Sequence, residues 1–547
     1  METGRPVSTA LRGMVATPHG LATQTGLRVL REGGNAIEAA VAAAATIAVV
    51  YPHMNSLGGD NVWLIYSART REVRGLNATG RAAAAATIGW YRERGVTDAI
   101  PPRGPLAANT VPGCVDGWAQ AHAFSREALG GRLPWAALLA DAIVYAEDGF
   151  PVTPSQEECT AHNLEASDDR IRHLQRFEGF RNAYVGPNGQ PVPRGQVMRL
   201  PALAASLRDL AREGPETFYR GNLGRRIADF LQRHGSPLTA EDFAAHTSTW
   251  VEPLRTTYRG YTALSLPPNT QGLAALSLLN LLEVHDLTSY GDGSPDYLHV
   301  MVEATKLAFA DRDRWVTDPD WVKAPLDRLL DKTYAAERAR RISPSRAAPA
   351  VVSGIAGGDT VALAVVDAAG NAVSLIQSIY FDYGSGIVAG DTGILMQNRG
   401  TFFSLDPGHV NALAPRKRTF HTLIPAMFLH DHRPYLVYGT MGGEGQPQTQ
   451  AALVTRVVDF GYDIQAAIEA PRWLYGRTWG LPTRGLYLEG RFSQATAAEL
   501  THRGHPVEVL GDWSESMGHA QGIVIDPQSG VRFGGADPRG DGSAAGY

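Results

Sequence analysis

The chain has 547 residues, of which 44% are hydrophobic and 19% charged, and its formal net charge is −5. Its length exceeds that of most single domains, and its composition is typical of a soluble globular protein. A mildly acidic chain gives no electrostatic reason to expect nucleic acid or an anionic membrane as a partner. The two cysteines, Cys114 and Cys159, are too few for a disulfide framework and do not form a metal-like pair. We expect both to be small buried hydrophobes.

The N-terminal segment, residues 1–20, contains no apolar stretch of signal-peptide length. The most apolar stretch, residues 36–51, contains Glu38 and is shorter than the roughly 20 residues that a membrane-spanning helix needs. We therefore expect a buried alanine-rich helix there. The whole protein is predicted to be soluble and cytoplasmic, with no membrane partner.

Hydrophobic periodicity predicts the elements of the first half of the chain. Residues 20–34 favour a helix that ends at a pair of glycines, and residues 36–51 favour a second helix. Apolar strands are expected within residues 56–67 and 72–81, each next to glycine turns. Residues 114–340 show mostly helical patterns.

A change of composition follows at residues 342–359, which are rich in Pro, Ala, Ser and Gly and show no period. Such a segment is typical of a connector. Residues 360–380 then predict a β-hairpin with its turn at residues 369–371, and further strands and glycine turns continue to the end. This mixture predicts an α+β chain with layered packing, in which two sheets lie between helices; periodicity alone leaves other α+β arrangements open.

Thr360 is the first candidate for chemistry, because it opens an apolar strand directly after Gly357, Gly358 and Asp359. A threonine hydroxyl is a poor nucleophile without an adjacent base. Cleavage of the bond before Thr360 would create that base, since an α-amino group has a pKa of about 7.7–8.0. By residue type alone, however, a threonine at the start of a strand is more often an ordinary strand residue.

Three further segments, two rich in glycine and one in histidine, contain residue types that can carry chemistry. Gly442 and Gly443 follow an apolar strand and precede a predicted helix, so their amides could stabilise an oxyanion, although a simple turn fits as well. Residues 383–400 lack a Walker lysine and dinucleotide spacing, which excludes nucleotide binding by this segment. Residues 430–432, His-Asp-His, are predicted to form a solvated turn rather than a metal site.

These segments, in this order, resemble the γ-glutamyltransferase family of N-terminal-nucleophile hydrolases. The resemblance runs from GMVATPHGLATQTGLRVLREGGNAIEAAVAAA near the N-terminus to GGADPRGDGSAAGY at the end. Between them it includes LPPNTQG (266–272), AFADRDRWVTDPDW (308–321), the hairpin that follows GDT (358–360), YGSGIVAGDTGILMQN (383–398) and MGGEGQPQ (441–448). Each string is weakly specific alone, whereas the ordered set is specific.

The resemblance implies an αββα sandwich and a precursor that cleaves itself between Asp359 and Thr360. The products would be a large chain, residues 1–359, and a small chain, residues 360–547, which remain associated as a heterodimer. Whether two such heterodimers pair is left open. No metal or organic cofactor is expected.

The resemblance also implies the catalytic roles. Thr360 would attack the carbonyl of a small amide and form an acyl-enzyme, and the amides of Gly442 and Gly443 would hold the oxyanion. Ser378 lies where the family usually has a second threonine, and it would hydrogen-bond the nucleophile or its amine. Water or an acceptor amine would then release the acyl group.

The residues that bind a γ-glutamyl group in the family are largely replaced in this sequence. The arginine position falls at Thr79, with Arg81 two residues later, and the serine pair falls at His421 and Thr422. The aspartate that binds the ammonium group is replaced by Phe402, which cannot replace a carboxylate.

A neighbouring asparagine position in the family falls at Tyr380. We predict a substrate pocket formed by Tyr380, Arg81, His421 and Thr422, together with Asn398 and Arg399 of the NRG segment. Arginines bind carboxylates bidentately, so an anionic acyl group is expected, although Arg81 and Arg399 are equally consistent with structural ion pairs.

The sequence therefore predicts an amidohydrolase for an amide whose acyl part carries a carboxylate. Oxamate-like and glutaryl-amide-like substrates are both left open. Two alternatives remain: a γ-glutamyl hydrolase or transpeptidase with an unusual pocket, and a non-catalytic scaffold of the same fold.

Overall fold

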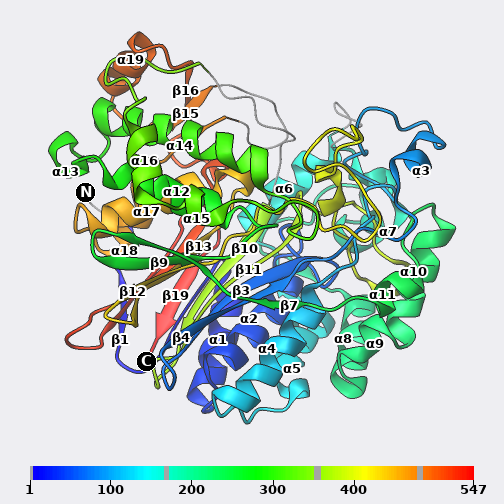
Figure 1. Cartoon of the computed structure of the whole chain (residues 1–547). Helices are drawn as coiled ribbons and strands as arrows, with labels where there is room; N and C mark the ends of the chain where they lie inside the picture. The colour runs from blue at the N-terminus through cyan, green and yellow to red at the C-terminus, as the bar shows by residue number, and fades with distance from the viewer. Residues whose placement is uncertain (1–3, 166–171, 350–358, 477–484) are drawn as a thin grey trace.

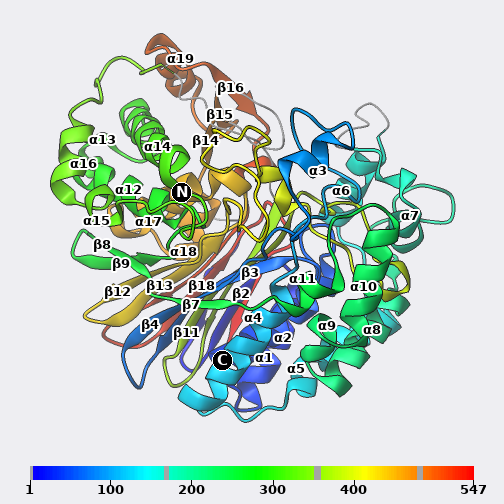
Figure 2. The ribbon, with the colours of Figure 1, turned by 45° about the vertical axis from the view of Figure 1, so that its right-hand side comes forward.

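The computed structural model describes residues 4–165, 172–349, 359–476 and 485–547. Two seven-stranded sheets lie face to face, and a layer of helices covers the outer face of each (Figures 1 and 2). This arrangement is the predicted αββα sandwich. None of the described helices is long and apolar enough to cross a membrane.

Both sheets are built from antiparallel pairs. In spatial order, the first sheet contains β1 (Ser8–Ala10), β18 (Arg532–Ala536), β17 (Ala520–Ile525), β13 (Arg433–Thr440), β12 (Ala426–His430), β9 (Tyr261–Ser265) and β8 (Leu254–Tyr258). The second contains β19 (Ser543–Gly546), β2 (Met14–Thr17), β10 (Asp359–Val366), β11 (Ala372–Tyr380), β3 (Asp60–Ser67), β4 (Glu72–Ala78) and β7 (Thr249–Val251). Each sheet thus combines strands from before and after the junction at Thr360.

Helices pack on the outer face of each sheet. The layer on the second sheet includes α1 (Gly20–Arg31), α2 (Ala36–Val50), α4 (Cys114–Ala128) and α5 (Trp135–Asp148). The layer on the first sheet includes α12 (Gly272–Glu283), α17 (Gln446–Val458) and α18 (Ile464–Glu469), with α14 (Pro295–Trp315) packed on α12.

Shorter elements surround these layers. The remaining helices are α3 (Ile88–Arg92), α6 (Pro154–Leu164), α7 (Glu178–Tyr184), α8 (Pro201–Glu213), α9 (Glu216–Tyr219), α10 (Asn222–Arg233), α11 (Ala240–Ala244), α13 (Leu287–Tyr290), α15 (Leu326–Leu329), α16 (Lys332–Ala339) and α19 (Gln494–His502). Two small sheets contain β5 (Phe150–Pro151) with β6 (Val197–Met198), and β14 (Trp473–Tyr475) with β15 (Leu486–Glu489) and β16 (Val507–Leu510).

The alanine-rich stretch forms helix α2, which is buried along its whole length. Its one charged residue, Glu38, belongs to a capping box: the Asn35 side chain accepts hydrogen bonds from the first turn, and the Glu38 carboxylate accepts from the Asn35 N–H at 2.9 Å. The second carboxylate oxygen accepts from the Leu133 N–H at 2.8 Å. Glu38 is therefore explained by capping the buried end of the helix.

The core between the sheets sets the orientation of Thr360. Ala362 and Ala364 of β10 lie in this core with Ile376 of β11. Gly439 on the facing sheet has no side chain, and a Cβ there would lie 2.5 Å from Ile376 Cδ1, so glycine permits the close approach of the sheets. Because alternate strand residues share a face, Thr360 continues the row of Ala362 and Ala364 and points between the sheets.

The structure refines the predicted elements in two places. The hairpin of β10 and β11 forms as predicted, whereas residues 350–358 of the predicted connector 342–359 lie outside the described residues. Strands β7, β8 and β9 lie within residues 249–265, inside a region whose pattern is mostly helical. These strands are only three to five residues long, so the helices around them dominate any longer sequence window.

Candidate active site

Thr360 lies at the start of β10 and is 1% exposed. The pairing register between β10 and β11 shifts by one residue at this point, so that Ser378 and Ile379 together lie opposite Thr360. Irregularities of this kind re-aim a side chain and are frequent next to active sites. Here the result is a hydrogen bond of 3.2 Å from Thr360 Oγ1 to Ser378 Oγ.

The Ser378 hydroxyl connects the threonine to a buried arginine. Its oxygen also accepts from the Tyr380 N–H and from Arg399 Nη2, both at 2.8 Å. Tyr380 has a φ of +82°, a left-handed conformation that is rare for a bulky residue. Such strained backbone is concentrated at functional sites, and here it ends β11 beside Ser378.

Arg399 lies in a short 3₁₀ helix (Arg399–Phe402) and is 1% exposed. Its Nη1 donates to Thr422 Oγ1 at 2.9 Å, and its guanidinium carbon lies 4.5 Å from the ring centroid of Tyr380. Within the described residues, its Nε has no acceptor and no carboxylate lies within ion-pair distance. Burial lowers the pKa of Arg399 to about 10, which leaves the group charged at neutral pH. Arg399 is therefore a buried cation without a carboxylate partner.

Aromatic side chains form one wall beside Arg399. Tyr380 and Phe402 pack with ring centroids 4.3 Å apart, and Phe402 meets Phe420 edge-on at 5.1 Å. Phe381 completes this cluster. The resemblance places the family's ammonium-binding aspartate at Phe402, and the wall observed there is aromatic and carries no negative charge.

A second buried contact lies between His421 and Asp60, whose Nε2 and Oδ2 are 3.2 Å apart. Burial, reinforced by the charge of Arg399, lowers the pKa of His421 to about 4, so the ring is neutral and donates to the carboxylate. The other Asp60 oxygen accepts from the N–H groups of Gly80 and Gly113 at 3.1 and 2.9 Å. Both oxygens of Asp60 thus accept hydrogen bonds from neighbouring residues. Asp60 is not among the site residues that the sequence predicts.

Gly442 and Gly443 connect β13 to α17 with φ values of +120° and +53°. Both values lie in the region that favours glycine. No described residue accepts a hydrogen bond from either N–H group. The pair therefore has the conformation and the free donors that an oxyanion site needs.

The glycine pair is held by residues from motifs to which the sequence assigned no role. Gln271 Nε2 donates to the carbonyls of Gly443 and Thr422, each at 2.9 Å. Arg312 on α14 donates to Gln271 Oε1 at 3.1 Å and to Glu444 Oε2 at 2.7 Å. This network joins the glycine pair to Thr422 and hence to the arginine side of the site. The signal was present in the NTQG, DRDRW and GGEG strings, of which Gln271, Arg312 and Glu444 are buried.

Two other predicted pocket residues are engaged elsewhere. Arg81 forms ion pairs with Asp318 at 3.1 Å and Asp320 at 3.0 Å, which is the structural alternative that the sequence left open. The Asn398 side chain donates to the Pro102 carbonyl at 2.7 Å and accepts from a backbone N–H of the neighbouring loop at 3.0 Å. Their contacts support the loop structure, and we do not include them in the reacting site.

Other sequence-level expectations concern residues away from the site. Asp431 and His432 have positive φ in the tight hairpin between β12 and β13, as predicted for a turn. Cys114 is buried, and Cys159 is partly buried. The glycines directly before Asp359 lie outside the described residues, as does the Asp359 side chain.

The sequence is similar to known proteins over almost its whole length. A model of the gamma-glutamyltranspeptidase family matches residues 22–547. The chain is 48% identical over 537 residues to the Bacillus subtilis protein named glutathione hydrolase-like YwrD proenzyme, covering 97% of this chain and 98% of that protein. It is 48% identical over 535 residues to the Klebsiella pneumoniae oxamate amidohydrolase proenzyme, covering 98% of each.

A solved structure is similar to this chain in both fold and sequence. Cephalosporin acylase from Bacillus halodurans matches with a TM-score of 0.90 and 38% identity, covering 100% of this chain and 98% of that one. The sandwich and these comparisons define an N-terminal-nucleophile hydrolase that acts on C–N amide bonds. Within that class, the chain belongs to the gamma-glutamyltranspeptidase family.

The network around the glycine pair predicts a selective effect on turnover. Replacing Arg312 with Met should lower kcat for amide hydrolysis roughly 10- to 100-fold with little change in KM, because oxyanion donors act mainly in the transition state. R312K should recover part of the rate. Steady-state kinetics test this, with R338M as the matched control, since Arg338 pairs with Asp311 on neighbouring helices. Equal kcat values for R312M and the unsubstituted enzyme would contradict the assigned role.

Proposed function

We propose that this protein is a self-processing amidohydrolase in which Thr360 attacks a small amide whose acyl group carries a carboxylate next to the scissile carbonyl, as oxamate does. The observation that carries the proposal is the buried cation of Arg399, which lacks a carboxylate partner within the described residues. A substrate carboxylate would supply that partner through a bidentate ion pair.

The proximity of Arg399 to the nucleophile favours a short acyl group. Thr360 Oγ1 and Arg399 Nη2 bind the same Ser378 oxygen, at 3.2 and 2.8 Å. A carboxylate on Arg399 therefore lies close to a carbonyl under attack by Thr360. In oxamate the two groups are directly bonded, whereas a glutaryl chain separates them by three methylenes and would have to fold against the aromatic wall.

The relatives support amide hydrolysis but differ in their named substrates. The Klebsiella relative is named for oxamate, and the matching solved structure is a cephalosporin acylase. The Bacillus relative is named glutathione hydrolase-like, which corresponds to the γ-glutamyl alternative. The packed rings of Tyr380 and Phe402 disfavour that alternative here, because an ammonium group at this wall would find no carboxylate.

Activation would begin with attack of Thr360 Oγ on the carbonyl of residue 359. The peptide bond to the Thr360 nitrogen breaks, an ester forms on Oγ, and water hydrolyses that ester. The products are the large chain 1–359, which ends in a carboxylate, and the small chain 360–547 with a free α-amine. Because each sheet contains strands of both chains, the two would remain associated as a heterodimer.

In turnover, the new α-amine would accept the hydroxyl proton of Thr360 as the oxygen attacks the substrate carbonyl. The N–H groups of Gly442 and Gly443 would stabilise the oxyanion. Its collapse breaks the C–N bond, and the protonated amine donates to the departing nitrogen. Water then hydrolyses the acyl ester and regenerates the threonine.

Self-processing gives the first test. The purified protein should separate into two bands on a denaturing gel, and the N-terminal sequence of the small chain should begin Thr-Val-Ala-Leu. T360A should remain a single folded chain, because it lacks the attacking oxygen, and T360S should still be cut. A small chain that starts at another residue, or cleavage of T360A, would exclude this processing reaction and favour a scaffold or another nucleophile.

Substrate choice gives the second test. R399M should lower kcat/KM for oxamate about 100-fold or more, because loss of a buried charge partner for a carboxylate costs several kcal/mol. R81M serves as the matched control and should retain the rate, since Arg81 pairs with Asp318 and Asp320. Assays should include a glutaryl amide and γ-glutamyl-p-nitroanilide. Preference for the γ-glutamyl compound, or a normal rate in R399M, would refute the proposed pocket.

A further inference from the structure

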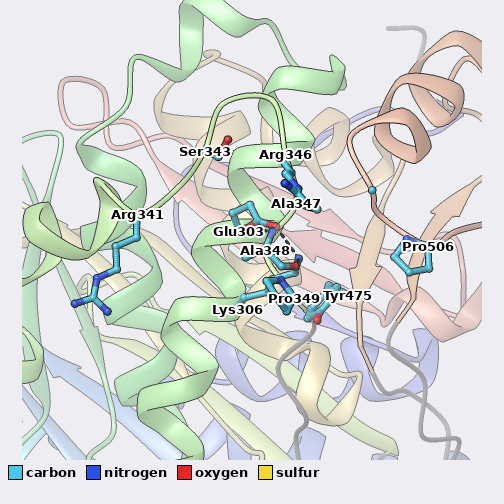
Figure 3. A pocket seen from close by; sticks show the side chains of 11 residues that line it. Glu303, Lys306, Arg341, Ser343, Arg346, Ala347, Ala348, Pro349, Tyr475 and Pro506 are labelled. Atoms are coloured by element: carbon cyan, nitrogen blue, oxygen red, sulfur yellow. Dashed lines mark hydrogen bonds and ion pairs between the residues drawn. The ribbon is translucent and has the colours of Figure 1, made fainter.

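A buried ion pair on α14 contacts the last described residues before the junction. Glu303 and Lys306 are 3% and 4% exposed, and Lys306 Nζ lies 2.6 Å from Glu303 Oε1. Burial of an ion pair is costly unless its remaining donors and acceptors are also bound. In this case they bind the chain that leads toward Thr360 (Figure 3).

Both charged groups bind the backbone of one residue, Ala348. The Ala348 N–H donates to Glu303 Oε2 at 3.0 Å, and Lys306 Nζ donates to the Ala348 carbonyl at 2.8 Å. The pair therefore satisfies both polar groups of this residue, as a neighbouring strand would. Because only the backbone atoms of Ala348 take part in these contacts, they fix the path of the chain at this residue independently of its side chain.

The segment just upstream is held as well, from both predicted chains. His299 Nε2 lies 2.7 Å from the Ser343 carbonyl, and the Ala347 N–H donates to the Arg503 carbonyl at 2.8 Å. His299 also bonds His505, with the two ring nitrogens 2.8 Å apart. Residues 343–348 are thus fixed between α14 and the loop after α19.

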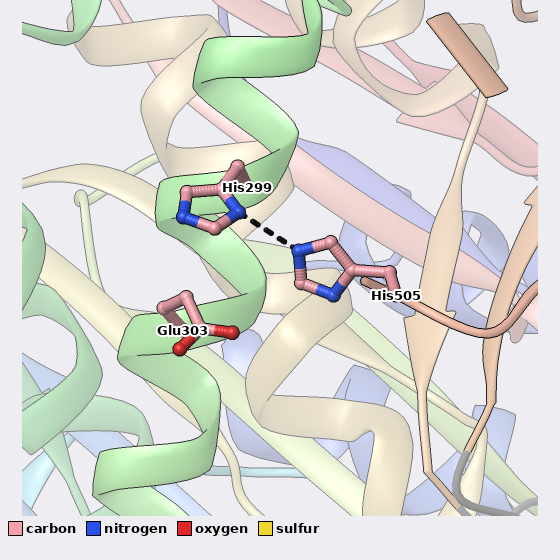
Figure 4. A group of neighbouring side chains, drawn as sticks. All are labelled: His299, Glu303 and His505. Atoms are coloured by element: carbon pink, nitrogen blue, oxygen red, sulfur yellow. Dashed lines mark hydrogen bonds between the residues drawn. The ribbon is translucent and has the colours of Figure 1, made fainter. Parts of the chain in front are cut away.

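His299, Glu303 and His505 bring three potential metal-ligand atoms together (Figure 4). Their bonds argue for a structural role. The two rings bond each other, and both Glu303 oxygens are occupied, one by the Ala348 N–H and one by Lys306. The ammonium charge of Lys306 at 2.6 Å also opposes a second cation.

We propose that Glu303 and Lys306 are positioning residues for self-cleavage, which hold Ala348 and thereby limit the orientations in which the carbonyl of residue 359 can meet Thr360 Oγ1. The inference rests on the self-cleavage proposed above. Anchoring Ala348 restrains the chain at a fixed point before the reacting bond and removes conformations that lead away from Thr360. After cleavage, Ala348 is no longer joined to Thr360, so the pair has no part in amide turnover.

The local space allows substitution of the pair. A pocket of about 430 Å³ lies beside it, lined in part by Tyr475, Arg346 and Pro349 (Figure 3). K306M and E303Q keep the approximate size of each side chain while removing the charge. K332M is the matched control, because Lys332 also pairs with a glutamate, Glu283, and donates to a backbone carbonyl, that of Thr257.

The experiment follows pulse-labelled precursor from cell-free translation on denaturing gels. K306M and E303Q should slow appearance of the two chains at least about tenfold, because misplacement of a reacting group strongly lowers the rate. The double variant should be no slower than the slower single variant, since the pair acts as one unit. K306R should restore much of the rate, and K332M should match the unsubstituted chain.

The cleaved variants distinguish positioning from a general folding defect. Once cut, K306M and E303Q should show unchanged kcat/KM for the amide substrate. Cleavage of K306M at the unsubstituted rate would overturn the inference, and so would an equal loss of kcat/KM in its mature form. If the unsubstituted chain is not cut before Thr360, the self-cleavage proposal itself fails. If the unsubstituted chain is cut normally and only the variants are slow, the self-cleavage proposal stands and the positioning role is supported.

Discussion

The site depends on a buried chain of hydrogen bonds from Thr360 through Ser378 to Arg399. Burying a guanidinium costs several kcal/mol unless charge and hydrogen bonds compensate it. Thr422, Ser378 and the ring of Tyr380 provide polar contacts but no negative charge. Within the described residues Arg399 is therefore a buried positive charge without a direct anionic partner beside the candidate nucleophile, and a carboxylate-bearing substrate is the partner that would pair with it.

The surrounding residues leave Arg399 without a direct ion pair within the part of the chain that the structure describes. The nearby carboxylate of Asp60 is occupied by His421 and two backbone N–H groups, and His421 is neutral because burial lowers its pKa. Gln271 and Arg312 hold the glycine pair at a fixed position relative to Thr422. The same structure that leaves Arg399 without an anion thus also fixes the amides that would receive the oxyanion.

Much of this could be predicted from sequence where the signal is local or carried by ordered motifs. The hairpin that begins near Thr360, the capped alanine-rich helix and the glycine turn before α17 follow from periodicity and glycine placement. The αββα sandwich and family membership followed from the resemblance. The catalytic role of Thr360 stays a prediction, since the geometry supports it without testing it.

Partner choice among buried polar groups could not be predicted, because it depends on contacts between distant segments. Arg81 and Arg399 carry the same group, yet Arg81 meets Asp318 whereas Arg399 meets hydroxyls and rings. Asp60, Gln271 and Arg312 give no local signal of their roles either, since each contacts residues far away in sequence. The anchor at Ala348 similarly requires α14 and the preceding connector to be placed together.

The most direct test of the central claim is intact-mass analysis of the processed protein, acid-quenched during turnover of oxamate. The account predicts that the small chain beginning at Thr360 gains the mass of one oxalyl group, and that peptide mapping places the adduct on Thr360. γ-Glutamyl amide should give no comparable adduct. An acyl group on another residue, or an adduct formed only with the γ-glutamyl compound, would contradict the account.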